Sequence, residues 1–226
     1  MRIRIAVEDI EPHHWIAWAL DLPACYSSAT TAVDAVAFAP RKIVEYFAWS
    51  CKHDNSLPIV SESIEVQVVE TFHSFASRED PEYIVNAFFE DDRCPVGYWE
   101  VEIALRLLGW TRQDLLGMLQ LITQEQLTKT IPGESRGSIA GILNHVAIAE
   151  NWYFGQLGLG MRDLPSDPLE KIEVVRANTR AQIIKLIGDE RVNQTCDELW
   201  SGRKIVRRTM WHERDHTQQI LQLLSI

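Results

Sequence analysis

Residues 211–216 read Trp-His-Glu-Arg-Asp-His and lie in the middle of the segment 202–224. At about 100° per residue, the apolar residues of this segment gather on one arc, which predicts an amphipathic helix. His212 and His216 lie about 40° apart around such a helix, so both imidazoles can reach one point. Both fall at the edge of the apolar arc, which consists of Ile205, Val206, Met210, Ile220, Leu223 and Leu224.

A third histidine, His145, has the same placement on a helix predicted over 138–157. It borders an apolar arc made of Ile139, Ile142, Leu143, Val146, Ala149 and Tyr153. A single inward histidine is most often a hydrogen-bonded core residue. Three together would be satisfied at once by one metal ion, and three protein ligands leave a position open for water or substrate. The sequence therefore offers His145, His212 and His216 as metal ligands.

Two carboxylates also fall on these inward arcs, Glu150 on the first helix and Glu213 on the second. Either is a candidate catalytic proton acceptor or a group that orients a histidine. The alternative is a structural role, in which the carboxylate pairs with a helix cap, an arginine such as Arg207 or Arg208, or water.

The residues from His212 to His216 also match His-Glu-x-x-His, the signature of zinc metalloproteases. That family needs a third ligand, usually downstream. The ten residues after His216 contain no His, Asp, Glu or Cys. We therefore reject the protease interpretation.

The second half of the chain has a helical pattern throughout. We predict helices over 96–121, 138–157, 168–187 and 202–224, with Ser138 as one N-cap and Asp167-Pro168 opening the third. Their lengths and short connections predict an all-α, antiparallel four-helix bundle over residues 95–226.

The first half has a different pattern and predicts an α+β module with a linker over residues 1–94. Alternating residues predict strands at 2–7, 15–20 and 64–69, and a further strand at 83–89 within the polar segment 77–94. A helix follows Thr30 or Thr31, although Pro40 lies inside it.

Charge and composition exclude several classes of function. The 22 Lys and Arg against 32 Asp and Glu give a net charge of −10, which predicts no nucleic-acid binding. No apolar run is long enough to cross a bilayer, and the early acidic residues argue against a secretory signal. The four cysteines form no Cys-x-x-Cys pair, which is typical of free thiols in a reducing compartment. We expect a cytoplasmic protein without membrane partners.

The second half resembles the DinB/YfiT-like superfamily of bundle metalloproteins. The matching segments are 110–116 (WTRQDLL), 123–127 (TQEQL), 142–150 (ILNHVAIAE) and 211–220 (WHERDHTQQI). In that family one histidine on the second helix and a His-x-x-x-His pair on the fourth bind the metal. The resemblance implies that His145, His212 and His216 do so here.

Roughly the first 50 residues resemble the HicB-like antitoxin fold, a partial ribonuclease-H-like sheet with a helix. The match is the run 20–25 (LDLPAC), followed by a short strand, a Thr and the helix. The family usually has Gly where Ala24 stands, and an acidic helix start where this chain has Thr31-Ala32-Val33-Asp34.

Three functions remain open. The DinB resemblance implies a metal- and thiol-dependent transferase or isomerase, in which the metal binds a small thiol that attacks an electrophilic substrate. A non-catalytic metal-binding protein in stress response or regulation is the second, and a toxin–antitoxin-like protein-interaction module is the third. For any of the three, we expect a homodimer. Three imidazoles suit zinc, nickel, copper or iron, so the sequence does not choose the divalent metal.

Overall fold

The computed structural model describes residues 1–57 and 63–224. The chain is mixed α/β, with a sheet near its start and helices in its second half. The described residues form two compact units. The first contains Met1–Cys94 and Gln194–Leu199, and the second contains Pro95–Asn193 and the described part of Trp200–Ile226. The short return of the chain to the first unit was not expected from the sequence.

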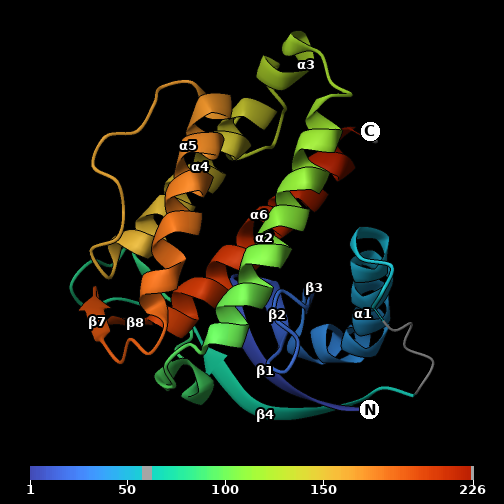
Figure 1. Cartoon of the computed structure of the whole chain (residues 1–226), viewed down its shortest axis with the longest axis vertical. Coiled ribbons are helices and arrows are strands. Elements are labelled where there is room, and N and C mark those ends of the chain that lie inside the picture. Colours follow the sequence, from blue (N-terminus) through green and yellow to red (C-terminus); the bar gives the residue numbers. More distant parts are fainter. Residues whose placement is uncertain (58–62, 225–226) are drawn as a thin grey trace. The chain divides into compact units, whose positions relative to one another are not determined.

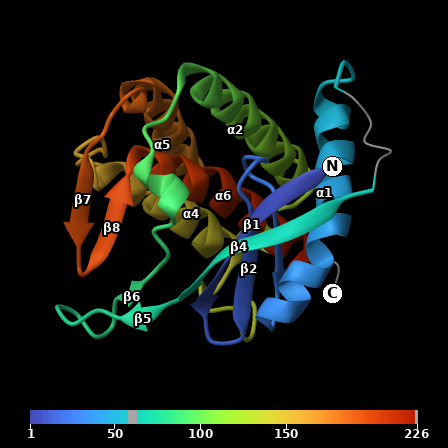
Figure 2. The same ribbon diagram turned by 90° about the horizontal axis from the view of Figure 1, so that it is seen from below.

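The first unit contains a twisted sheet (Figure 2). Its strands are β1 (Arg2–Glu11), β2 (His14–Ala19), β3 (Tyr26–Ala29) and β4 (Glu65–His73), in the spatial order β3-β2-β1-β4. β1 pairs antiparallel with β2 and parallel with β4. β1 buries Ile3 and Ile5, while Arg2 and Arg4 stay exposed, as the alternation of the strand predicts.

Helix α1 (Ala32–His53) packs on this sheet. Thr31 is its N-cap, since the Thr31 hydroxyl accepts a hydrogen bond from the Asp34 amide at 3.1 Å. Pro40 lies inside the helix without ending it. The helix buries Ala35, Ala39, Ile43 and Tyr46, and this packing offsets the cost of about 3 kcal/mol that an internal proline carries.

The segment 77–94 is less regular than predicted. The strand expected at 83–89 is only β6 (Ile84–Val85), which pairs with β5 (Phe75–Ala76), and a 3-10 helix η1 (Glu90–Arg93) follows. A hairpin of β7 (Val192–Thr195) and β8 (Glu198–Ser201) occupies a stretch for which we predicted only a connection.

The second unit contains the long helices α2 (Tyr98–Leu119), α4 (Ile139–Gly155), α5 (Pro168–Gln182) and α6 (Gly202–Leu224) (Figure 1). A short helix α3 (Gln124–Thr128) follows α2, and a 3-10 helix η2 (Ile183–Leu186) follows α5. The predicted caps are confirmed: Ser138 accepts from the Gly141 amide at 3.1 Å, and Asp167 accepts from the Glu170 amide at 2.9 Å.

These helices share a hydrophobic core. α4 packs against α5 and α6, and α2 packs against α6. The buried core side chains are Leu115, Met118, Leu127, Ile139, Ile142, Leu143, Val146, Ala147, Ile172, Val175 and Ile220. The contact of α4 with α6 brings the helix that carries His145 beside the helix that carries His212 and His216.

Candidate metal centre

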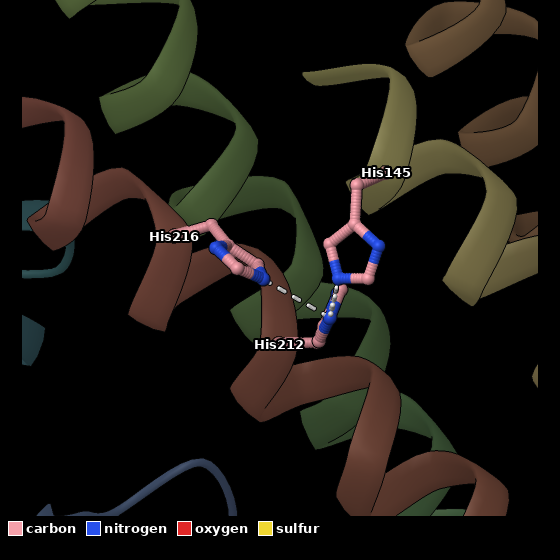
Figure 3. A group of neighbouring side chains, drawn as sticks. All are labelled: His145, His212 and His216. Carbon is pink, nitrogen blue, oxygen red and sulfur yellow. Dashed lines mark hydrogen bonds between the residues drawn. The ribbon is translucent and has the colours of Figure 1, made fainter. Parts of the chain in front are cut away.

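The three histidines predicted from the sequence lie together between α4 and α6. His145 extends from α4 toward His212 and His216, which are one turn apart on α6 (Figure 3). The Nε2 atom of His212 is 3.1 Å from that of His145 and 3.2 Å from that of His216. The ligand atoms of the cluster all lie within 4.8 Å of one another. Three imidazole edges therefore converge on one point.

The tautomer of His216 follows from its neighbours. The Gln219 Nε2 amide donates to the Glu134 carboxylate at 2.9 Å, so the Gln219 Oε1 oxygen faces His216. That oxygen accepts a hydrogen bond from Nδ1–H of His216 at 2.6 Å. Because Nδ1 carries the proton, the Nε2 atom of neutral His216 presents its lone pair to the centre.

His145 is assigned in the same way. Nη2 of Arg136 lies 3.4 Å from Nε2 of His145, and a guanidinium only donates. Nε2 of His145 is therefore unprotonated and acts as an acceptor. His212 stands between two such acceptors, and its own Nε2 can donate to one of them at most. Without a cation, at least one of these two close nitrogen pairs has no hydrogen bond between its atoms.

A divalent ion fits this donor set. It would accept all three lone pairs at once and remove the unfavourable contact. With metal–nitrogen bonds of about 2.0–2.1 Å, two nitrogens of a tetrahedral site stand about 3.3 Å apart. The measured separations of 3.1 and 3.2 Å are close to that value. The histidines are thus positioned to bind a metal ion.

Electrostatics keep the imidazoles in the form that binds metal. Burial lowers the pKa of His145 to about 4, and the positive charge of Arg136 acts in the same direction. Burial also lowers the pKa of His212 well below its ordinary value. Both rings are neutral at neutral pH, so their lone pairs remain available.

The ring of His212 is oriented by packing. Its Nδ1 atom is buried and has no hydrogen-bond partner among the described residues. The ring of Tyr153 meets it edge-on, with centroids 5.8 Å apart, and the neighbouring Trp211 ring lies 5.5 Å away. Aromatic contacts therefore hold the ring of His212 in place, whereas hydrogen bonds hold the ring of His216.

A tight loop before α4 brings Glu134 and Arg136 to the centre. The Ile131 amide donates to the Gly137 carbonyl at 2.8 Å, and the Glu134 carboxylate accepts from the Arg136 amide at 2.9 Å. Gly137 has φ +79°, a conformation that favours glycine. Gly141 in the first turn of α4 lies against the Arg136 carbonyl, where a Cβ would overlap it.

In the described chain, neither Glu150 nor Glu213 forms a hydrogen bond to any of the three histidines. Glu150 accepts from Nε and Nη2 of Arg176, both at 2.9 Å. Glu213 accepts from Nε and Nη2 of Arg112, at 3.1 and 2.7 Å, and lies 3.0 Å from Arg176. The partners of the two glutamates are therefore Arg112 and Arg176, and not Arg207 or Arg208, which the sequence had suggested.

This charge network is mostly buried and reaches the surface at Glu173, whose carboxylate accepts from Nη1 of Arg112 at 3.1 Å. Burial raises the pKa of Glu150, but the charge and hydrogen bonds of Arg176 outweigh that effect and the pKa ends below its ordinary value. Each arginine also donates to a backbone carbonyl, Arg112 to Ile172 at 2.8 Å and Arg176 to Leu108 at 2.7 Å. Glu150 is therefore held as the ionised partner of Arg176, and Glu213 accepts hydrogen bonds from Arg112.

Sequence reasoning missed three residues around the centre. Gln219 follows His216 by three positions on one helix, a spacing that could have identified it as a neighbour. Glu134 and Arg136 lie in a loop, where helical periodicity carries no information. These three residues surround the histidines that the sequence placed on inward helix faces.

Comparisons with protein-family models, with curated proteins and with solved structures found no match. In the part of the chain that the structure describes, no helix is both long and apolar enough to cross a membrane. The assignment of function therefore depends on the site itself.

Proposed function

We propose that this protein binds one divalent metal ion per chain through His145, His212 and His216. The observation that carries the proposal is the convergence of the three Nε2 atoms, with those of His145 and His216 at 3.1 and 3.2 Å from that of His212. The surrounding fold is, in this proposal, an antiparallel four-helix bundle of the DinB type, made of α2, α4, α5 and α6. Their shared core and the contact between α4 and α6 support it.

Zinc, nickel or iron suits the site. Imidazole binds each of these metals, and the choice among them depends on geometry and supply. Three protein ligands leave at least one position open for a small molecule. A divalent ion there would act as a Lewis acid and lower the pKa of a thiol or water that it binds.

The catalytic form of the proposal is a thiol-dependent transferase or isomerase. In a transfer, the thiol sulfur forms a bond to an electrophilic carbon, the leaving group departs with its bonding electrons, and the thiol proton goes to water. The chain would contribute the three ligands, the Gln219 and Glu134 pair that fixes His216, and the exposed Arg136 beside His145.

A non-catalytic metal-binding protein is the second candidate. The pairing of Glu150 with Arg176 and of Glu213 with Arg112 favours it, because ionised glutamates held by arginine are poor proton acceptors. In this candidate the same three histidines bind the metal, and the protein acts in storage, sensing or regulation.

Metal analysis of the purified full-length protein tests both candidates. We expect about one divalent ion per chain after dialysis against zinc, nickel or ferrous iron. The double variant His145→Ala, His212→Ala should bind none, whereas His73→Ala, on the exposed surface of the first unit, should bind as the parent does. Full metal retention in the double variant would overturn the proposal. An assay for turnover of a thiol with an electrophilic substrate then distinguishes the catalytic candidate from the non-catalytic metal-binding protein.

A further inference from the structure

Arg136 is placed at the metal centre without a carboxylate to hold its guanidinium. Its side chain is exposed, and its Nη2 atom lies 3.4 Å from Nε2 of His145. The nearby Glu134 accepts from the backbone amide of Arg136 and from Gln219 instead. In the described part of the chain, no ion pair to this guanidinium is found.

The backbone of Arg136 is nevertheless fixed. Its carbonyl lies against Gly141 on α4, and its amide donates to Glu134 at 2.9 Å. The loop thus keeps the charged side chain beside the histidines, while no carboxylate in the described chain pairs with the guanidinium. This combination is typical of an arginine that binds a ligand.

The charges around the centre indicate whether that ligand is positively or negatively charged. A divalent ion and the Arg136 guanidinium would together place three positive charges beside neutral histidines. Glu134 supplies one negative charge, whereas the charge of Arg208 also acts on His212. Glu150 and Glu213 pair with Arg176 and Arg112, and the third carboxylate of that network, Glu173, is exposed. The excess is positive, so the open position favours an anion, and a neutral ligand would leave metal and guanidinium repelling each other.

We propose that the open position takes a small anionic molecule that binds the metal through one atom and Arg136 through a carboxylate. This inference rests on the proposed function and names its ligand class: a thiol with a carboxylate close to the sulfur. When the metal binds Nε2 of His145, the Arg136 guanidinium gives up its contact with that atom. It then forms a bidentate, charge-assisted ion pair with the carboxylate of the ligand.

Cobalt-loaded full-length protein provides the test. Its ligand-field spectrum would be followed while mercaptoacetate, 2-mercaptoethanol or acetate is added stepwise. We expect mercaptoacetate to bind at least about tenfold more tightly than 2-mercaptoethanol in the parent protein, since an Arg–carboxylate pair is charge-assisted. Arg136→Gln should abolish that preference and retain the cobalt, and Arg136→Lys should keep part of it. Arg162→Gln, at an exposed loop position, is the matched control.

The outcomes are distinguishable. An equal preference for mercaptoacetate in Arg136→Gln and in the parent overturns the role of Arg136, while the metal site stands. Binding of acetate that depends on Arg136, without any effect of either thiol, supports the anion site and overturns the thiol-dependent function. Failure to bind cobalt overturns the metal centre and this inference together.

Discussion

Arg176 donates two hydrogen bonds to the carboxylate of Glu150, from Nε and from Nη2, each at 2.9 Å. Both side chains are about 4% exposed, so neither charge has water to replace its partner. A buried ion pair contributes little net stability as a whole, but removing one member leaves an uncompensated buried charge. The pair therefore makes the second unit sensitive to single substitutions.

Arg176→Met should lower the free energy of unfolding by about 3–5 kcal/mol, because Glu150 keeps its charge without a partner. Urea denaturation measures the change. Arg41→Met is the matched control, since it breaks the exposed pair of Arg41 with Glu45 and should cost no more than about 0.5 kcal/mol. Equal effects of the two substitutions would contradict the assignment of a structural network.

The same network should weaken in acid. The pKa of Glu150 lies below its ordinary value of 4.5, so the folded state binds its proton less readily than the unfolded chain does. The stabilisation is complete above about pH 4.5 and is lost as the pH falls further toward the folded pKa. Stability measured between neutral pH and pH 3 should fall less steeply in Glu150→Gln than in the parent. Identical slopes would show that Glu150 does not contribute.

Gln219→Ala should reduce metal affinity about 10–100-fold, because His216 loses the acceptor that keeps the proton on Nδ1. Competition with a chelator measures the affinity. Gln222→Ala, at an exposed position of the same helix, should leave it unchanged. If Gln219→Ala binds metal as tightly as Gln222→Ala, then His216 does not depend on this hydrogen bond.

Gly141→Ala should displace the loop that carries Glu134 and Arg136, since the added methyl group would overlap the Arg136 carbonyl. We expect a loss of stability of about 1–3 kcal/mol together with weaker metal binding. Gly117→Ala should instead raise the stability, because the added Cβ has no neighbouring atom within 4 Å. Alanine also favours the helix over glycine by about 0.5–1 kcal/mol. Thermal unfolding of both variants, with and without zinc, checks the contrast.

Ala24→Gly should stabilise the first unit. Ala24 has φ +63°, a left-handed conformation that costs a residue with a Cβ about 1–2 kcal/mol. Glycine removes this strain but has more freedom in the unfolded chain, so we expect a net gain of about 0.5–1 kcal/mol. Ala177→Gly, on an exposed face of α5, should instead cost about 1 kcal/mol. A loss of stability in Ala24→Gly would show that the turn is not strained.

Periodicity predicted the parts of the site that lie on long helices. Helical spacing placed His145, His212 and His216 on inward faces, and the structure brings them together. It also placed Glu150 and Glu213 inward, and both are buried. Spacing gives the direction of a side chain but not its partner, because the partner lies on another helix whose rotation is set by packing. Arg112 and Arg176 could not be identified in this way.

The hairpin of β7 and β8 was missed for a reason of turn chemistry. A two-residue hairpin turn with positive φ at both positions is usually signalled by Asn-Gly or Asp-Gly. Here the turn residues are Cys196 and Asp197, with φ +49° and +65°. Aspartate is common in such turns, but cysteine is not, and no glycine follows it. The flanking strands are also too short to show alternation.

That hairpin makes the first unit discontinuous along the chain. The Asp197 carboxylate accepts hydrogen bonds from the Arg78 amide at 2.8 Å and from the guanidinium of Arg78 at 3.0 Å, across 119 residues of sequence. Glu198 accepts from the Tyr83 hydroxyl at 2.6 Å. During synthesis on the ribosome, residues 1–94 emerge long before these acceptors exist. The unit can therefore complete its structure only after most of the helical segment has been translated, and a fragment cut at Cys94 lacks a piece of its own fold.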